Sequence, residues 1–239
     1  MDDHHNNSWL TERAHQAMLD NGFEPEFSDA VYSQLRQIAD RGEPSHGADI
    51  QDLRHLLWSS IDNRTSRDLD QVEWAERLEN DDIRVLVGIA DVDAIVAKGT
   101  PIDVHAAQNT VTVYTESKIF PMLPEELSTD KTSLNQDEDR FAVVADMTVR
   151  ANGDVPESTF FRAFIRNHAK FSYEEIGEWL DGDGPMPEEL QRLPELKAQI
   201  ELQREAAKRL AAYREKKGAL EFESIESSAV VEDGEIKGL

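Results

Sequence analysis

Three aspartates lie close together in the segment SSIDNRTSRDLDQ, directly after an apolar run. They are Asp62, Asp68 and Asp70, and Arg64 and Arg67 lie between them. Carboxylate oxygens are the ligands that magnesium prefers, and a nucleic-acid phosphate can complete its coordination shell. Asp68 and Asp70 would share one side of an extended segment, because side chains alternate along a strand. The spacing therefore allows a magnesium site.

A solvated acidic loop is the competing interpretation of the same segment. The chain has 49 acidic residues among 239, so a window of about 11 residues holds about two carboxylates by chance. In this interpretation Arg64 and Arg67 neutralise neighbouring acids at the surface, where ion pairs are weak. Spacing alone leaves both interpretations open.

Length and composition limit the kinds of protein that the chain can be. Its 239 residues, of which 39% are hydrophobic, can bury one large core or two small ones. The absence of cysteine excludes disulfides, thiolate metal sites and a cysteine nucleophile, and a reducing cytosol is the simplest location. No signal peptide and no apolar run of about 18 residues is present. The sequence predicts a cytoplasmic protein without a membrane partner.

The formal charge of −24 opposes non-specific attraction to phosphate backbones. Any role with nucleic acid must therefore use a local site. Such acidity also suits a protein solvated in high salt, where screening removes self-repulsion. An ordinary acidic cytosolic protein fits the composition equally well.

The start of the chain predicts helices. Ser8 is placed to cap a helix that ends at Asn21 and Gly22, and Ser28 is placed to cap a second helix. The segment GEPSHGAD then predicts a loop. We expect a helical amino-terminal segment over 1–50 and a larger domain over 51–239.

Strand patterns begin soon after the aspartates. They are RVLVGIADV, TVTVYT, FAVVADMTV with an Asn-Gly turn after it, and STFFRAFI. Helical signals follow. Ser172 and Glu175 have capping-box spacing, and residues 187–217 form the longest helical pattern, in which Pro194 marks the first turn and Gly218 the end. The last 13 residues predict a strand, an Asp-Gly turn and a second strand.

The aspartate segment resembles the motif I-D-x-x-x-x-x-D-x-D-D, which opens the catalytic domain of the RNase II / RNase R (RNB) family of exoribonucleases. Three further segments are similar to blocks of that family in the same order: VGIADVDAIVAKGTPIDVHA, TVYTESKIFPMLPEELSTDKTSLN and REKKGALEFE. Together the matches run from about Leu53 to Leu239. The resemblance implies an α+β fold, in which a mixed, bent sheet is covered by helices and represents the first part of the RNB catalytic domain.

The resemblance also implies an activity and its residues. It implies a magnesium-dependent hydrolase that shortens single-stranded RNA from the 3′ end and releases 5′-mononucleotides. Asp62 and Asp68 match metal-binding positions, and Asp70 matches an aspartate essential for cleavage that shares the Mg²⁺ site. Gln71 stands where the family has a fourth aspartate. Glutamine can ligate through its carbonyl oxygen but brings no charge, so occupancy of a second magnesium stays open.

Three aromatic residues match family positions that contact RNA: Tyr114, Tyr173 and Phe222. Bases that stack on aromatic faces gain about 1 to 3 kcal/mol each without sequence preference. The competing interpretation is packing within the protein. Family position favours the RNA role for Tyr114, whereas packing is the better interpretation of Tyr173 and Phe222 from the residues alone.

The matched region ends near the middle of the family's catalytic domain. The resemblance therefore predicts that the carboxy-terminal half, with an arginine-bearing SPIRRY-like segment, is missing, and that a separate chain could supply it. The alternative function is a catalytically silent RNB-like fragment that binds RNA or a partner chain without cutting. Gln71 favours this alternative, while the three aspartates favour the enzyme.

Overall fold

The structure is a computed structural model that describes residues 3–41, 49–115, 117–220, 230–232 and 235–238. It contains two compact units. The first unit comprises Met1–Glu43, Val96–Glu125 and Phe222–Leu239, and the second comprises Pro44–Ile95 and Glu126–Glu221. The three aspartates belong to the second unit. The division of the chain into segments 1–50 and 51–239 stays a prediction.

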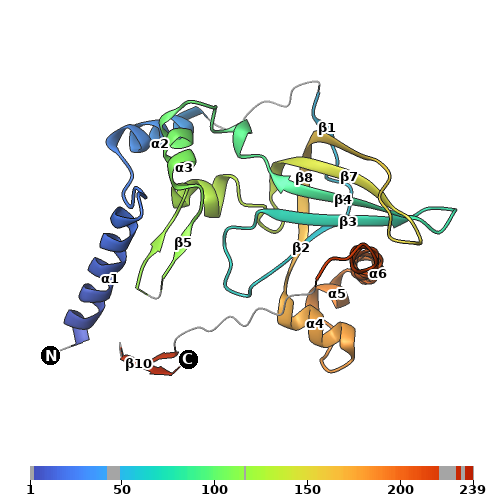
Figure 1. The fold of residues 1–239 in the computed structure, drawn as a ribbon. Coiled ribbons are helices and arrows are strands. Elements are labelled where there is room, and N and C mark those ends of the chain that lie inside the picture. The colour runs from blue at the N-terminus through green and yellow to red at the C-terminus, as the bar shows by residue number, and fades with distance from the viewer. Residues whose placement is uncertain (1–2, 42–48, 116, 221–229, 233–234, 239) are drawn as a thin grey trace. The chain divides into compact units, whose positions relative to one another are not determined.

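A strongly bent sheet forms the second unit (Figure 1). Its strands are β1 (Gln51–Asp52), β2 (Trp58–Asp62), β3 (Gln71–Arg77), β4 (Ile83–Ala90), β7 (Asp139–Val149) and β8 (Ser158–Ser172). Their order is β1-β8-β2-β3-β4-β7, and β8 also pairs with β7. With 15 residues, β8 is long enough to pair with β7 along its first part and with β2 along its second part. The strands β8, β2, β3, β4 and β7 therefore close into a ring.

Strand directions are mixed in this ring. The strand β2 runs parallel to β8, and the other neighbouring pairs are antiparallel. One face of each strand packs into a common core, whose fully buried members include Trp58, Val72, Leu86, Val144 and Ile165. In β3, β4, β7 and β8 the residue that follows the core residue is more exposed, whereas in β2 Ser59 and Ser60 are buried as well as Trp58. The predicted mixed, bent sheet is confirmed.

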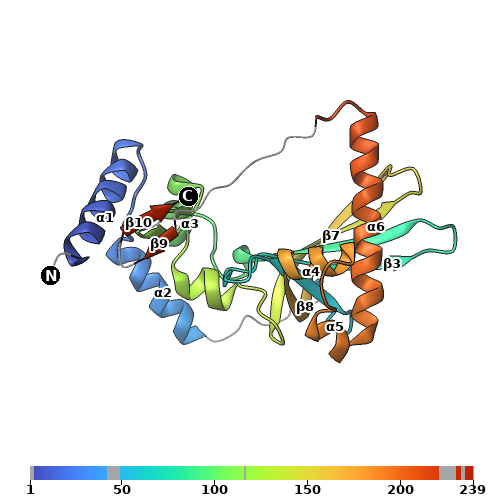
Figure 2. The same ribbon diagram turned by 90° about the horizontal axis from the view of Figure 1, so that it is seen from below.

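Helices cover the opposite face of this sheet. They are α4 (Tyr173–Asp181), α5 (Glu188–Arg192) and α6 (Pro194–Lys216), and Figure 2 shows α6 crossing β3 and β7. The Ser172 and Glu175 capping box is confirmed. The helix predicted over 187–217 is divided, because Pro194 begins α6 and ends the short α5 before it. Two short helical turns, η1 (Val92–Ala94) and η2 (Glu126–Lys131), complete the unit.

The first unit contains helices and short strand pairs. Its elements are α1 (Asp3–Asp20), α2 (Asp29–Arg41), α3 (Pro101–Asn109), β5 (Val113–Tyr114), β6 (Ile119–Phe120), β9 (Val230–Glu232) and β10 (Glu235–Gly238). The predicted cap at Ser28 is confirmed, because its Oγ accepts a hydrogen bond from the Val31 N–H at 3.4 Å. The predicted cap at Ser8 is wrong, since α1 already begins at Asp3.

Two strand predictions also fall in the first unit. TVTVYT forms a strand only at Val113–Tyr114. The prediction of two terminal strands is confirmed by the antiparallel pair β9 and β10. Among the described residues, no helix is long and apolar enough to cross a membrane.

Candidate active site

The aspartates lie where β2 ends and β3 begins. Asp62 is the last residue of β2, and Asp70 directly precedes β3. The two strands are antiparallel with Ser59 opposite Glu73, and this register carries Asp62 and Asp70 to the same end of the pair. The side chain of Asp62 accepts hydrogen bonds from the Asn63 N–H at 2.6 Å and from Ser66 Oγ at 2.8 Å. The strand pairing thus brings together carboxylates that are eight positions apart in the chain.

Electrostatic interactions connect all three predicted aspartates. The pKa of the Asp70 carboxyl is raised above its ordinary value, first by loss of hydration and then by the charges of Asp62 and Asp68. A cation placed among them would relieve this repulsion. The structure therefore places the three predicted carboxylates within electrostatic range of one another.

The type of donor in this site fits a hard divalent cation, since all the side chains offer carboxylate oxygens. Within the part of the chain that the structure describes, no three acidic or histidine side chains form a ready-made metal group. Magnesium commonly binds to one or two carboxylates, several waters and a substrate phosphate rather than to a cage of protein ligands. The site therefore suits an ion that arrives together with phosphate.

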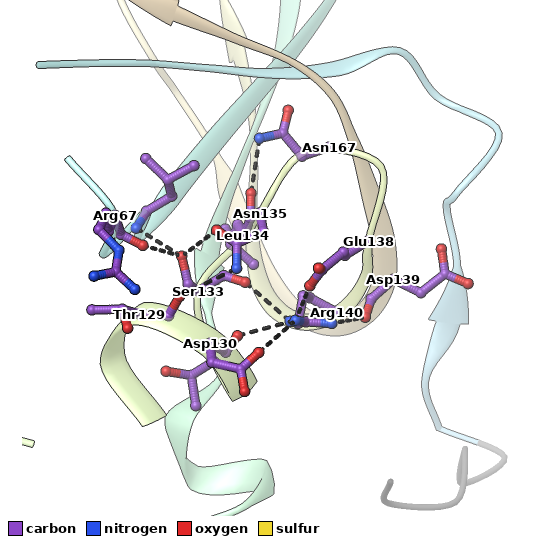
Figure 3. A network of polar contacts seen from close by, with 12 residues as sticks. Arg67, Thr129, Asp130, Ser133, Leu134, Asn135, Glu138, Asp139, Arg140 and Asn167 are labelled. Carbon is purple, nitrogen blue, oxygen red and sulfur yellow. Dashed lines mark hydrogen bonds and ion pairs between the residues drawn. The ribbon is translucent and has the colours of Figure 1, made fainter. Parts of the chain in front are cut away.

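A buried serine holds the loop that carries Asp68. The Leu69 N–H donates to Ser133 Oγ at 3.0 Å, and this hydroxyl donates to the Arg67 carbonyl at 2.8 Å (Figure 3). The Leu134 N–H donates to the Leu69 carbonyl at 2.8 Å. These bonds fix the backbone on both sides of Asp68.

Asn167 extends the same network to two strands. Its Nδ2 donates to the Leu134 carbonyl at 2.8 Å and to Ser60 Oγ at 3.0 Å, and all three residues are buried. Ser60 lies on β2 and Asn167 on β8. The loop is therefore tied to the strand that ends at Asp62, which fixes the position of one aspartate relative to the other.

Two basic residues hold the surrounding backbone. Arg140 donates to the Ser133 carbonyl at 3.0 Å and forms an ion pair with Glu138 (Figure 3). The Lys170 ammonium group donates to the Arg64 carbonyl at 3.3 Å and also to the carbonyl of Ser66. Both cations thus act on main-chain oxygens near the aspartates.

The structure corrects the interpretation of the two arginines between the aspartates. Among the ion pairs of the described residues, none includes Arg64 or Arg67. Instead, the Arg64 carbonyl accepts a hydrogen bond from Lys170, and the Arg67 carbonyl accepts one from Ser133. The predicted ion pairs with neighbouring acids are therefore not formed among the described residues, although both side chains are exposed as predicted.

None of these supporting residues was singled out by the sequence analysis. Ser133 and Leu134 belong to the third matched block, within TSLN, which was the available signal. Asn167 and Lys170 lie just beyond the predicted strand STFFRAFI, in a segment that carried no functional signal.

Replacement of Ser133 by alanine should destabilise the protein and slow any reaction at the aspartates. The change leaves the buried Leu69 N–H and Arg67 carbonyl without this partner, so we expect a loss of about 1 to 3 kcal/mol in the free energy of unfolding. Misplacement of Asp68 should lower activity about 10-fold. Urea unfolding and RNA degradation assays measure the two effects. Ser158→Ala, at an exposed position on β8, is the control and should change neither; equal effects in both variants would contradict the prediction.

Tyr173 lies beside the carboxylates. It follows Ser172, the partner of Asp62 in the pairing of β2 with β8. Its pKa is raised by loss of hydration and by the charges of Asp62, Glu73 and Asp70. The side chain is nevertheless 54% exposed, so packing in the core does not describe it. Its role in RNA binding stays a prediction.

The other two aromatic candidates lie outside the described part of the second unit. Tyr114 belongs to the first unit, at the end of β5, and is 63% exposed. Phe222 lies outside the described residues. Their roles in RNA binding stay predictions.

Glu73 is a fourth carboxylate near the site that the sequence analysis missed. Its pKa is raised to about 7, first by loss of hydration and then by the charge of Asp70. In an acidic chain a single glutamate within a strand carries no signal, and only its partly buried position sets it apart.

The raised pKa of Glu73 predicts that stability falls as pH rises. Between about pH 4.5 and 7 the folded protein keeps a proton on Glu73 that the unfolded chain has lost, so folding binds protons and loses stability with increasing pH. The shift corresponds to about 3 kcal/mol over this range. Urea unfolding in EDTA from pH 4.5 to 8 should show this slope in the original protein and a smaller slope in Glu73→Gln. The same slope in both proteins would contradict the assignment.

Comparisons with known proteins identify the family. A model of the RNB domain matches residues 50–239. Ribonuclease R of Escherichia coli (strain K12) is 34% identical over 201 residues, which cover 84% of this chain and 24% of the relative. Ribonuclease R of Vibrio parahaemolyticus is 31% identical over 209 residues, 86% of this chain and 24% of the relative. The chain thus spans about a quarter of the length of these relatives.

Solved structures support the same conclusion. RNase R of Mycoplasma genitalium in complex with ribose-methylated single-stranded RNA superposes with a TM-score of 0.78 at 27% identity, covering 91% of this chain and 33% of that chain. Its complex with double-stranded RNA gives the same TM-score and identity. Yeast Ssd1, a pseudonuclease, shares only the fold, at 14% identity and a TM-score of 0.51. The resemblance inferred from the sequence motifs is confirmed: the chain belongs to the RNB (RNase II / RNase R) family of exoribonucleases.

Proposed function

We propose that this protein is a magnesium-dependent, hydrolytic 3′-to-5′ exoribonuclease that acts on single-stranded RNA in the cytoplasm and releases 5′-mononucleotides. The observation that carries the proposal is the gathering of Asp62, Asp68 and Asp70 at the junction of β2 and β3. Two similar structures are of an RNase R bound to RNA, one single-stranded and one double-stranded.

In the proposed reaction the aspartates hold the cation and remain ionised beside it. A bound magnesium ion would lower the pKa of a water and neutralise charge on the phosphate. The pKa of Asp70 is raised by loss of hydration and by the charges of Asp62 and Asp68, and a cation would stabilise its ionised form. Ser133 keeps the loop in place, so the carboxylates need little rearrangement when phosphate arrives.

The aromatic residues would bind the RNA by stacking against its bases. Tyr173 borders the carboxylates with an exposed ring, so a terminal base could stack on it next to the phosphate that is cut. Tyr114 would position the last bases. Stacking suits this acidic chain, because it does not depend on positive charge.

The alternative function is a silent RNB-like chain that binds RNA or a partner chain, such as a separate second half of the catalytic domain. Gln71 favours it, because the family's fourth carboxylate is missing at that position. The affinity for RNA, measured at several salt concentrations, distinguishes RNA binding from the absence of binding. Phosphate contacts make log affinity fall linearly with log salt.

Removal of magnesium tests the proposal directly. A 5′-labelled single-stranded RNA incubated with the full chain and magnesium should give a ladder that shortens from the 3′ end, and EDTA in excess should stop the reaction because the carboxylates alone cannot activate water. Readdition of magnesium should restore it. Binding without shortening would support the silent alternative, and neither binding nor shortening would contradict both.

A further inference from the structure

Two exposed arginines lie in the loop between β2 and β3. Arg64 and Arg67 stand between Asp62, the last residue of β2, and Asp68. Among the described residues, neither guanidinium group forms an ion pair or a hydrogen bond, and Figure 3 shows the Arg67 side chain directed away from the network around Ser133. An arginine is always charged and carries several N–H donors. Both side chains can therefore receive an anion from solution.

The backbone that carries these arginines is held in place. The Arg67 carbonyl accepts a hydrogen bond from the buried Ser133 hydroxyl at 2.8 Å. The Arg64 carbonyl accepts one from the Lys170 ammonium group at 3.3 Å. Each side chain thus starts from a fixed point and ends in solvent. A fixed starting point lowers the cost of ordering a side chain when a ligand binds.

The same loop returns to the carboxylates. The Ser66 hydroxyl donates to the Asp62 carboxylate at 2.8 Å. Arg67 is the next residue, so its Cα atom is about 3.8 Å from that of Ser66, and Asp68 follows it directly in the chain. The backbone of Arg67 therefore lies beside the carboxylates, and its long side chain can reach a phosphate group that neighbours one bound there.

Positive and negative charges are equal in number in this loop before a cation binds. Residues 62–70 include three aspartates and two arginines, and the Lys170 ammonium group adds a third positive charge where it donates to loop carbonyls. A divalent cation would make this formally neutral group positive. The chain as a whole carries a charge of −24 and repels phosphate, so a local positive charge is needed to hold RNA at the aspartates.

We propose that Arg67, with Arg64 beside it, binds an RNA phosphate next to the one that is cut and so holds the strand at the aspartates. The inference rests on the proposed function, in which RNA is the substrate, and it deepens that function by naming groups that bind the substrate backbone. A planar guanidinium group can donate two parallel hydrogen bonds to phosphate oxygens. Arg67 is the principal contact, because a buried hydroxyl fixes its carbonyl.

Binding of single-stranded RNA tests the proposal without measuring cleavage. A 5′-fluorescein-labelled RNA is titrated with the full chain in EDTA, and fluorescence anisotropy gives the affinity at several salt concentrations. We expect Arg67→Gln to weaken binding about 10-fold at low salt and to reduce the slope of log affinity against log salt by about 0.7, the value for one phosphate of a single strand. Arg64→Gln should have a smaller effect on affinity.

A conservative variant separates charge from geometry. Arg67→Lys keeps the positive charge but loses the planar fork of donors. It should retain the original salt slope and bind RNA less tightly than the original protein but more tightly than Arg67→Gln. Urea unfolding should give the same stability for all three proteins, because the Arg67 side chain makes no polar contact among the described residues.

Arg214→Gln is the matched control, since it removes the same charge from an exposed position in the last turn of α6. Five residues earlier on this helix, Arg209 donates to the carbonyl of Asp81, in the turn between β3 and β4. That turn is at the opposite end of β3 from Asp70. We expect Arg214→Gln to retain both the affinity and the salt slope of the original protein.

A modified RNA locates the contact. A methylphosphonate removes the charge of one linkage, and it is placed in turn at each of the last linkages before the 3′ end. At the linkage that Arg67 contacts, the loss from the methylphosphonate and the loss from Arg67→Gln should not add, because both remove the same interaction. At the other linkages the two losses should add.

The outcomes separate this inference from the proposed function. Equal affinities and slopes for Arg67→Gln and Arg214→Gln would overturn the inference, and magnesium-dependent shortening of RNA by the same preparations would leave the proposed function intact. Additive losses at every linkage would also overturn the inference. Binding that depends on Arg67 without any shortening would overturn the proposed hydrolysis alone. Absence of RNA binding by the original protein would overturn both.

Discussion

Replacement of Asp70 by asparagine should lower the rate of magnesium-dependent RNA shortening about 10³-fold or more, while the fold remains intact. Asparagine keeps the size of the side chain but removes the charge that would hold the cation and the attacking water. The fold should not suffer, because Asp70 is ionised against the charges of Asp62 and Asp68, and the change removes this repulsion. Single-turnover shortening of 5′-labelled RNA measures the rate, and urea unfolding measures stability.

A matched control separates this effect from a general loss of charge. Asp183→Asn makes the same chemical change at an exposed position after α4, at the end of that helix opposite to Tyr173. We expect it to retain the original rate. Equal losses in the two variants, or an Asp70→Asn protein that is as active as the original, would contradict a catalytic role for Asp70.

Replacement of Gly153 by alanine should lower the free energy of unfolding by about 2 to 4 kcal/mol. Gly153 lies in the predicted Asn-Gly turn after β7 with a φ of 81°, a left-handed conformation that alanine adopts only with strain. A Cβ atom at this position would lie 2.0 Å from the Arg209 carbonyl oxygen of α6. Because this atom belongs to the helix backbone, α6 itself would have to shift. Equilibrium urea unfolding measures the loss.

Gly177→Ala provides the opposite control. Gly177 lies inside α4, and a Cβ atom there would meet nothing within 4 Å. Since glycine is a poor helix former, this variant should gain about 0.5 to 1 kcal/mol. A Gly153→Ala protein as stable as the original would show that the turn does not pack closely against α6.

Local chemistry made most elements predictable. The capping box of Ser172 and Glu175 and the start of α6 at Pro194 depend on residues within a few positions of each other. The start of α1 was predicted wrongly at Ser8, because a capping residue shows where a helix can begin but does not prevent it from beginning earlier. The strand at Val113–Tyr114 is short because strand length depends on the pairing partner.

The site was predictable only in part. The spacing of Asp62, Asp68 and Asp70, together with the family motifs, indicated their common role. Their supports were not predictable from spacing, because Ser133 lies more than 60 positions from the loop it holds. Asn167 is further still from Ser60. Hydrogen bonds between such distant residues exist only after the ring has closed.

The sequence by itself determined the family, the three aspartates and the missing fourth carboxylate at Gln71. It also determined the principal strands and helices. Each of these features depends on residue types and short-range spacing. Only the tertiary structure decided which backbone groups Ser133 and Lys170 hold, that Arg64 and Arg67 form no ion pairs in the described part of the chain, and that Glu73 faces the buried hydroxyl of Ser59. The physical reason is that loss of hydration and cross-strand pairing depend on segments that are distant in the chain. Both arise when β2, β3 and β8 come together, so no local pattern encodes them.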